Sequence, residues 1–350
     1  MPAKNKAIDI ETFLSKSQHT PIIDVRSPSE FKRGHIPGAI NIPIFNDDER
    51  AAVGTTYVQK GRDLAVEQGL GYVGPNLVRF VKMAKEKAPN NELLVHCWRG
   101  GMRSASMAWL FNTADISTYT LVGGYKSYRN YVLKSFDADF KFVILGGMTG
   151  SGKTAILKEI ENQGQQVIDL EGIANHKGSA FGALGQQPQP TTEHFENILY
   201  TQLSKLDTSK HIWLEDESKA IGGVFIPDAF FAQMRQSLVM AIERPKEVRV
   251  RRLVEEYAFF NPEELSAAVN RISKRLGGDN TKECLESIES GNIARAIEIS
   301  LSYYDKTYTY GLSNRTQKPY QIELGDDNPS HDAATIIGKA WDILEGKEKS

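Results

Sequence analysis

A glycine-rich segment between a predicted strand and a predicted helix is the strongest constraint on the fold of this 350-residue chain. It reads Gly-Met-Thr-Gly-Ser-Gly-Lys-Thr over residues 147–154 and follows the apolar run 141–145. In such a loop, backbone N–H groups and the N-terminus of the next helix point at phosphate oxygens. Lys153 would neutralise a terminal phosphate, and Thr154 could hold Mg²⁺. The sequence therefore predicts a di- or triphosphate site formed by Gly147, Gly150, Ser151, Gly152, Lys153 and Thr154.

Short apolar runs alternate with helical patterns on both sides of this glycine loop. After it we predict strands at 167–168, 211–214 and 238–242, helices at 193–206, 245–256 and 332–344, and mostly helical structure over 262–310. Before it we predict strands at 21–25, 93–95 and 119–122, with a polar helical excursion over 46–90. Alternation of this kind indicates α/β domains with parallel sheets.

A short polar segment at 136–139 separates the two alternating regions. At about 150 residues per domain, a chain of this length is expected to form two domains. We therefore predict one domain at 1–137 and a second at 138–350, the latter with a helical C-terminal part.

Composition excludes several classes of protein. Lys and Arg total 42 against 44 Asp and Glu, so the net charge of −2 offers no large basic surface. No apolar run is long enough to span a bilayer and no signal-peptide core follows the N-terminus, so we expect a cytoplasmic protein without membrane contact. The two cysteines, Cys97 and Cys284, form neither a disulfide framework nor a four-ligand zinc site, and no metal ligand set is assigned.

Cys97 stands at the end of a predicted strand and opens a loop that leads into a helix. The loop contains two glycines and two arginines, and its residues are Trp98, Arg99, Gly100, Gly101, Met102 and Arg103. Backbone N–H groups and the arginine charges would favour the thiolate, which is the reactive form of cysteine. We predict Cys97 as the catalytic residue, whereas His96, on the opposite face of the strand, is expected to be structural.

Acidic residues follow the predicted strand 211–214. Glu215 and Asp216 could contact Mg²⁺ near the glycine loop, although acidic residues in this position are equally often a solvated loop.

The motifs of the first domain carry a resemblance to a known family. Ile-Asp-Val-Arg at 23–26, Glu30-Phe31, Gly-His-Ile-Pro-Gly-Ala at 34–39 and the Cys97 loop together resemble a rhodanese domain. A rhodanese-like domain joined to a P-loop NTPase-like domain is similar to the bacterial tRNA 2-selenouridine synthases, and the similarity covers essentially the whole chain. This resemblance implies two parallel-sheet domains in that order.

The resemblance also implies a reaction. Family members convert 2-thiouridine at the tRNA wobble position to 2-selenouridine, with selenophosphate as donor, through an S-geranyl-2-thiouridine intermediate made from geranyl diphosphate. Cys97 matches the residue that carries selenium, and the glycine loop offers a seat for the diphosphate. Selenophosphate and geranyl diphosphate are then co-substrates, Mg²⁺ is an optional ion, and ATP is not required.

The same resemblance implies tRNA as a partner, together with the enzyme that produces selenophosphate. The wobble base lies in a single-stranded loop and could stack on Trp98 or Arg99, although Trp98 could equally be a packing residue. Basic residues grouped in one predicted helical region could contact tRNA phosphates; they are Arg249, Arg251, Arg252, Arg271, Lys274 and Arg275.

Other functions fit parts of the sequence. His-Cys, five residues and Arg-Ser at 96–104 also match a cysteine phosphatase. A rhodanese-type sulfurtransferase coupled to an ATP-using P-loop domain, and a non-enzymatic selenium carrier, are further alternatives. ATP turnover without RNA would indicate the ATP-using alternatives, and loading of Cys97 without transfer to RNA would indicate the carrier.

Overall fold

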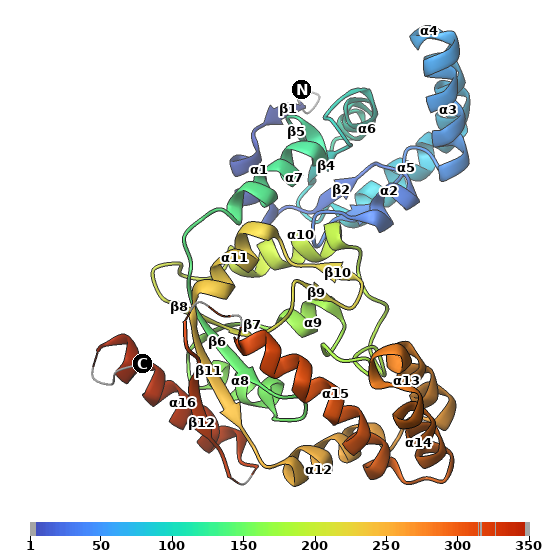
Figure 1. Ribbon diagram of the computed structural model, residues 1–350. Helices are drawn as coiled ribbons and strands as arrows, with labels where there is room; N and C mark the ends of the chain where they lie inside the picture. The colour runs from blue at the N-terminus through green and yellow to red at the C-terminus, as the bar shows by residue number, and fades with distance from the viewer. Residues whose placement is uncertain (1–4, 314, 316, 326, 347–350) are drawn as a thin grey trace. The chain divides into compact units, whose positions relative to one another are not determined.

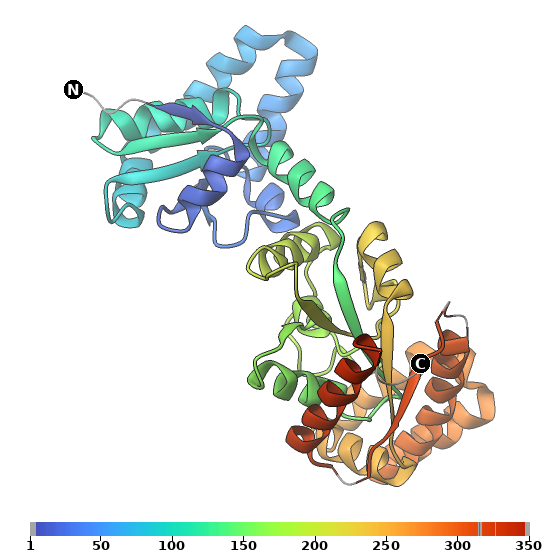
Figure 2. The ribbon, with the colours of Figure 1, turned by 90° about the vertical axis from the view of Figure 1, so that its left-hand side faces the viewer.

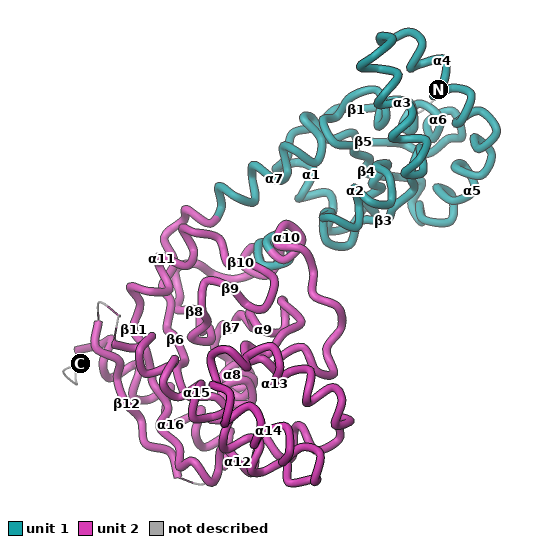
Figure 3. The backbone as a smooth tube through the Cα atoms, turned by 45° about the vertical axis from the view of Figure 1, so that its right-hand side comes forward, with its two compact units in different colours: residues 1–135, 196–200 teal, residues 136–195, 201–350 magenta. Residues whose placement is uncertain are grey.

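The computed structural model describes residues 5–313, 315, 317–325 and 327–346. The chain divides into two compact units, coloured separately in Figure 3. Unit 1 contains residues 1–135 together with 196–200, and unit 2 contains residues 136–195 and 201–350. The change of unit after residue 135 lies close to the predicted domain boundary at 137.

Unit 1 is built on a five-stranded parallel sheet with the strand order β1-β5-β4-β2-β3. Its strands are β1 (Lys6–Ile8), β2 (Ile22–Asp24), β3 (Ile40–Asn41), β4 (Glu92–His96) and β5 (Ser117–Leu121). Its helices are α1 (Ile10–Ser17), α2 (Pro28–Arg33), α3 (Asp47–Lys60), α4 (Arg62–Val73), α5 (Leu77–Lys87), α6 (Met102–Thr113) and α7 (Gly124–Ser135), with a short 3₁₀ turn at Gly74–Asn76.

The polar excursion between β3 and β4 is helical, as the sequence predicts, and comprises α3, α4 and α5 (Figure 1). Helix α3 begins with a capping box, in which Asn46 accepts from the Glu49 N–H and Glu49 accepts from the Asn46 N–H. No residue of α3 is fully buried. Helices α3 and α4 pack against each other as a hairpin. Its outer surface is largely exposed to solvent.

Unit 2 contains a second five-stranded parallel sheet, with the order β12-β11-β6-β8-β7 (Figures 1 and 2). Its strands are β6 (Lys141–Gly147), β7 (Gln166–Ile168), β8 (His211–Glu215), β11 (Leu238–Glu243) and β12 (Tyr320–Glu323), and β9 (Ala220–Ile221) pairs with β10 (Val224–Phe225) as an antiparallel hairpin. The helices are α8 (Lys153–Asn162), α9 (Leu170–Ala174), α10 (Thr192–Leu203), α11 (Asp228–Gln236), α12 (Lys246–Tyr257), α13 (Pro262–Leu276), α14 (Gly278–Glu289), α15 (Ile293–Ser313) and α16 (Pro329–Leu344).

Apolar clusters hold unit 2 together. Residues of α8 and α16, such as Ile160 and Ile336, pack on strands β6, β11 and β12. Helices α12 to α15 have a separate cluster, which includes Leu253, Val269 and Ile297. The C-terminal helices therefore form a subdomain with its own core, and this subdomain builds one wall of the cavity described below.

Some elements are not predicted by the sequence. Strands β1 and β12 are edge strands with mostly exposed or half-buried residues, and the hairpin strands β9 and β10 have only two residues each. Such strands lack the continuous apolar run that marks a central parallel strand. Within the described residues, no helix is long and apolar enough to span a membrane.

Candidate functional site

The Cys97 loop lies between the end of β4 and the start of α6, and two glycines hold it against the turn after β5. Gly100 has φ +67°, and a Cβ atom there would lie 2.6 Å from the Leu121 carbonyl oxygen. Gly124 has φ +60°, and a Cβ atom there would lie 2.4 Å from the Cys97 carbonyl oxygen. Because only glycine fits such close backbone contacts at positive φ, the loop conformation depends on both positions.

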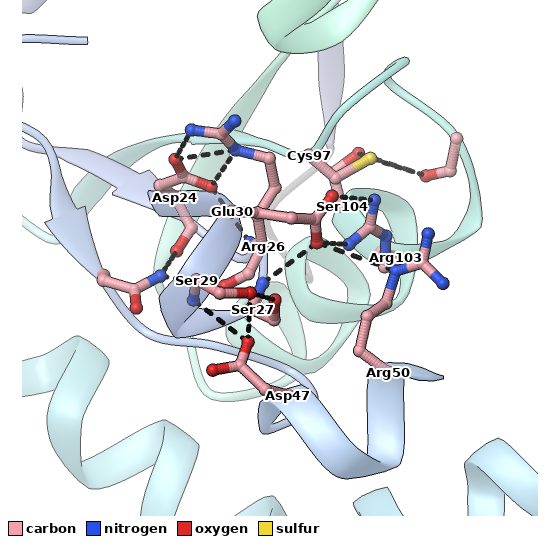
Figure 4. Close-up of polar contacts among 12 residues, drawn as sticks. Asp24, Arg26, Ser27, Ser29, Glu30, Asp47, Arg50, Cys97, Arg103 and Ser104 are labelled. Carbon is pink, nitrogen blue, oxygen red and sulfur yellow. Dashed lines mark hydrogen bonds and ion pairs between the residues drawn. The ribbon is translucent and has the colours of Figure 1, made fainter. Parts of the chain in front are cut away.

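The Cys97 side chain is 3% exposed and faces the first turn of α6. Its sulfur lies 3.2 Å from Ser104 Oγ and 3.9 Å from the Gly101 carbonyl oxygen, and the Ser104 hydroxyl donates to the same carbonyl at 3.1 Å. Hydroxyl and carbonyl groups thus surround the thiol within its own loop (Figure 4).

Arg103 closes the loop and is held by a carboxylate from α2. Its Nη1 donates to Glu30 Oε2 at 2.6 Å and its Nη2 donates to Glu30 Oε1 at 3.2 Å (Figure 4). Arg50 of α3 approaches the same carboxylate, with Nε 3.6 Å from Oε2. Burial opposes the ionisation of Glu30, but Arg103, the Ser27 N–H and Arg50 together lower the pKa of this carboxyl below its ordinary value. Glu30 is therefore a carboxylate shared by two arginines.

A buried ion pair lies at the end of β2, which is the neighbour of β4, the strand that leads into the Cys97 loop. Asp24 and Arg26, at the end of β2, are both at most 1% exposed, and Arg26 Nη2 donates to Asp24 Oδ2 at 2.6 Å and to the Gly34 carbonyl at 2.7 Å. The Arg26 guanidinium lies over the Tyr125 ring, 3.8 Å from its centroid. His96 is fully buried, and this burial lowers its pKa, which fits the structural role predicted for it.

The other predicted residues of the loop differ in exposure. Arg99, Gly100, Gly101 and Met102 are exposed, and Arg103 is partly buried. Trp98 is half-buried, with its ring 5.8 Å from the Tyr125 ring. Arg99 is thus accessible to a ligand, whereas Trp98 also packs inside unit 1.

The glycine loop of unit 2 has the geometry expected between a strand and a helix. β6 ends at Gly147 and α8 begins at Lys153, and Gly150 and Gly152 have φ values of +82° and +90°. Lys153 Nζ donates to the Gly147 carbonyl at 2.8 Å, so the ammonium group is folded over the loop. The backbone thus leaves its N–H groups at the helix start, where a phosphate would bind.

A cavity of about 1070 Å³ opens in front of this loop. Its walls are formed by the glycine loop, by α12, which lies against that loop, and by α13 and α15, and these helices contribute arginine, tyrosine and aliphatic side chains. The residues of these helices that line the cavity include Arg252, Leu253, Arg271, Ile272, Arg275 and Tyr303. The cavity therefore combines a phosphate-binding end with a wall that is partly cationic and partly apolar.

The acidic residues that face this cavity differ from those expected. Glu215 is fully buried and accepts a hydrogen bond from the Leu170 N–H at 3.1 Å, and it does not line the cavity. Asp216 lines the cavity but forms an ion pair with Arg315. The hypothesis that Glu215 contacts Mg²⁺ is therefore wrong, because its side chain points into the packed interior beside β7.

Glu171 and Glu217 take the place expected for Glu215 and Asp216. Both line the cavity, and the Thr154 hydroxyl donates to Glu171 Oε2 at 3.2 Å. A Cβ atom at Gly178 would lie 2.9 Å from an oxygen of each carboxyl, so the two groups converge. Burial and the charge of Glu171 raise the pKa of Glu217 well above its ordinary value, and burial raises the pKa of Glu171. Each carboxyl therefore favours its protonated form more than a solvent-exposed glutamate does.

Thr154, Glu171 and Glu217 suit a hard cation such as Mg²⁺ only in combination with a phosphate ligand. No group of three or more His, Cys, Asp or Glu side chains in the described residues is arranged to hold a metal ion. Mg²⁺ is commonly held by one or two carboxylates together with substrate phosphates, and Thr154 with Glu171 supplies such a partial set.

The basic residues predicted to contact tRNA have three different environments. Arg249 is 4% exposed, and its guanidinium donates twice to Asp305 at 2.8 Å. Arg252, Arg271 and Arg275 line the cavity, whereas Arg251 and Lys274 are exposed and do not line it. Arg249 is a buried structural residue, which contradicts its expected role as an RNA contact.

Sequence reasoning missed Arg50, Glu171 and Glu217. Glu171 lies in the first turn of α9, shortly after β7 ends. An acidic residue at such a position after a strand is a signal by which it could have been found. Arg50 carries no such signal, because it lies in the polar helical excursion and approaches Glu30 only in the folded chain.

Together these features define a class of protein: a rhodanese-like domain that presents a cysteine loop, joined to a domain with a phosphate-binding loop. A family model described as "Rhodanese-like domain" matches residues 9–131. A second model, described as "tRNA 2-selenouridine synthase AAA domain", matches residues 140–328.

Relatives match both domains. A tRNA 2-selenouridine synthase from Nitrosomonas europaea is 33% identical, over 86% of this chain and 91% of the relative. Those from Sulfurovum sp. and Bordetella petrii are 35% identical, over 87% and 89% of this chain and 89% and 91% of the relatives. The chain belongs to the tRNA 2-selenouridine synthase family, which confirms the resemblance found in its motifs.

A solved structure is similar to part of the chain. The N-terminal domain of a Clostridium difficile 630 protein described as ATP/GTP binding is 39% identical over 37% of this chain and 99% of that chain, with a TM-score of 0.35.

Proposed function

We propose that this protein converts 2-thiouridine at the wobble position of tRNA to 2-selenouridine. The observation that carries the proposal is that relatives named tRNA 2-selenouridine synthase match the chain across both domains. The Cys97 loop and the glycine loop both lie within the matched domains.

The first step of the proposed reaction takes place at the glycine loop of unit 2. The sulfur of 2-thiouridine attacks the first carbon of geranyl diphosphate, the carbon–oxygen bond breaks, and diphosphate leaves while the base loses its N3 proton. The loop N–H groups and Lys153 stabilise the charge that develops on diphosphate, and the apolar part of the cavity wall accommodates the hydrocarbon chain. A Mg²⁺ ion bound with the diphosphate would contact Thr154 and Glu171. ATP is not required in this scheme.

The second step replaces sulfur by selenium. Alkylation makes the sulfur at C2 a good leaving group, so a selenium nucleophile can form the C2–Se bond as the C2–S bond breaks and geranylthiolate departs. Selenophosphate is the proposed source of selenium: water cleaves its P–Se bond, phosphate leaves, and the released selenide is held at Cys97, the proposed selenium carrier, until it attacks C2. The enzyme that makes selenophosphate is the proposed protein partner, and the cytoplasm is the proposed location.

The RNA substrate needs contacts near both loops. Exposed Arg99 is suited to stack against an unpaired base, and exposed Arg251 and Lys274 are suited to bind phosphates. Arg271 and Arg275, which line the cavity, are the candidates for contacts next to the thiouridine.

Mass spectrometry of nucleosides tests the proposal. The protein is incubated with 2-thiouridine-containing tRNA and with geranyl diphosphate or selenophosphate, each alone and both together. Geranyl diphosphate alone should give S-geranyl-2-thiouridine, and both donors together should give 2-selenouridine. Unchanged RNA with turnover of ATP or of a phosphoester would contradict the proposal and indicate a kinase or phosphatase.

A further inference from the structure

Arg50 approaches Glu30, the carboxylate that holds Arg103, from outside the rhodanese-like motifs. It lies on α3, in the helical hairpin between β3 and β4, and its Nε is 3.6 Å from Glu30 Oε2. The same oxygen accepts from Arg103 Nη1 at 2.6 Å. Two guanidinium groups from distant parts of unit 1 therefore meet at one carboxylate beside the loop that contains Cys97 (Figure 4).

The start of α3 is fixed so that Arg50 points at this carboxylate. Asp47, in the first turn of α3, accepts from the Ser29 N–H at 3.0 Å and from the Ser29 hydroxyl at 2.6 Å. Ser29 and Glu30 are neighbours in α2, so this contact brings the next turn of α3 to Glu30. A Cβ atom at Gly54 would lie 2.7 Å from Arg50 Nη1, so the glycine leaves the space that the guanidinium occupies.

Two guanidinium groups approach the single carboxylate of Glu30. Glu30 carries one negative charge, and its lowered pKa keeps it ionised at neutral pH. Arg50 and Arg103 carry two positive charges. The Nε–Oε2 distance of Arg50 is too long for a hydrogen bond, and Nε has no hydrogen-bond partner within the described residues. Asp47, bound to Ser29, adds a second carboxylate at this point, so it is the donors of Arg50 without a partner in the described part of the chain, rather than a surplus of charge, that suit an oxyanion.

We propose that Arg50 and Arg103 together bind the tetrahedral oxyanion of the selenium donor beside Cys97, with Arg50 as a specificity-determining residue. The inference rests on the proposed function, because that function places the donor at Cys97. A guanidinium presents paired N–H donors that match phosphate oxygens, and two of them on one anion discriminate a dianion from a monoanion. The donor class is a phosphate-like dianion that bears one chalcogen atom.

Binding of thiophosphate, a stable analogue of this class, tests the inference. The full chain carrying Lys153→Ala is titrated calorimetrically, so that the glycine loop contributes little to the signal. Arg50→Gln in this background should weaken binding about tenfold, the loss expected for one charge-assisted contact. Arg50→Lys should give an intermediate affinity, because it keeps the charge but loses the paired donors.

Two further variants give the test its controls. Arg62→Gln removes an exposed arginine from the same helical hairpin and should bind thiophosphate as tightly as the parent. Glu30→Gln removes the competing carboxylate but keeps an acceptor for the Ser27 N–H, and it should bind the anion more tightly. A purely structural role of Arg50 would not produce these opposite changes.

A second measurement locates the anion. The rate at which methyl methanethiosulfonate modifies Cys97 is measured by peptide mass spectrometry, and thiophosphate should slow it in the parent but much less in Arg50→Gln. Sulfate at equal ionic strength measures the part of the effect that any dianion produces.

Equal binding by the parent and Arg50→Gln, or equal weakening in Arg50→Gln and Arg62→Gln, would overturn the inference. Either result leaves the proposed function standing if geranyl transfer and selenation proceed. Conversely, unmodified RNA with intact thiophosphate binding would reject the proposed function while the anion site at Arg50 remains.

Discussion

Cys97 and Lys153 are single residues that serve different chemical steps in the proposed reaction. Replacing Cys97 by alanine should abolish selenation and leave S-geranyl-2-thiouridine to accumulate, because the thiol is not needed for alkylation. Nucleoside mass spectrometry with both donors checks this outcome. Cys284→Ala, which changes a fully buried thiol in unit 2, is the control and should still give 2-selenouridine. Loss of both geranyl transfer and selenation in Cys97→Ala would show that Cys97 does not act in selenation alone.

Lys153→Ala should have the opposite effect. Without the ammonium group, charge on the departing diphosphate is less well stabilised, so geranyl transfer should fall by about a hundredfold, in the range measured for comparable electrostatic groups. The rate is measured with limiting geranyl diphosphate. Lys158→Ala, further along α8, serves as the control. Geranyl transfer at the normal rate would show that the glycine loop does not take part in the alkylation step.

The raised pKa of Glu217, which lies beside Glu171, makes the stability of the protein depend on pH. Because the pKa of Glu217 is raised in the folded chain, the folded state keeps a proton that the unfolded state releases above about pH 4.5. The associated stability is present below that pH and is lost as the pH rises towards the folded pKa, by up to about 1.4 kcal/mol per pH unit. Glu217→Gln should therefore raise the melting temperature relative to wild type at pH 8 but not at pH 5.

The matched control for this prediction is Glu286→Gln, which changes a glutamate on α14 that is 64% exposed. Its melting temperature should follow that of wild type at both pH values. If Glu217→Gln loses stability equally at pH 5 and pH 8, the carboxyl is needed for its hydrogen bonds rather than held as a protonated partner of Glu171.

The conformation of the Cys97 loop depends on glycines at positions where a Cβ atom would collide with the backbone. Gly124→Ala would place a methyl group 2.4 Å from the Cys97 carbonyl at a positive φ, so the unfolding free energy should fall by roughly 2 kcal/mol or more. Gly101→Ala is the control in the same loop, since Gly101 has φ −97° and open space around its Cα. Urea unfolding of both variants checks the difference, and equal stability would show that the loop adapts without cost.

Each of the two loops is built by residues of one unit, and the proposed intermediate is a covalently altered RNA. A mixture of Cys97→Ala and Lys153→Ala chains should therefore restore selenation, because the first chain makes the geranylated tRNA that the second consumes. Nucleoside mass spectrometry of the mixture and of each variant alone measures this complementation. Failure of the mixture, with each variant retaining its own half-reaction, would mean that the intermediate is not released between the steps.

The amino-acid sequence alone is sufficient for the order of the domains, the class of fold and the two loops. Apolar runs that alternate with helical patterns indicate parallel strands, because a strand that is buried on both faces is apolar along its whole length. The Cys97 loop and the glycine loop can also be recognised from consecutive residues, although the Cys97 loop packs against Gly124 only in the folded chain. The short edge strands β1 and β12 could not be predicted, because their pairing rather than an apolar run makes them strands.

Tertiary structure decided which charged groups surround these loops. Glu30 and Arg103 are 73 residues apart in the chain, and Arg50 joins them from a helix whose own sequence is only polar. Likewise, Glu171 and Glu217 meet because β7 and β8 are neighbours in the sheet, whereas burial removes Glu215 from the cavity and Asp305 neutralises Arg249. Charges act through space over a few ångströms, so their partners follow from the packing of the elements and not from their spacing along the chain.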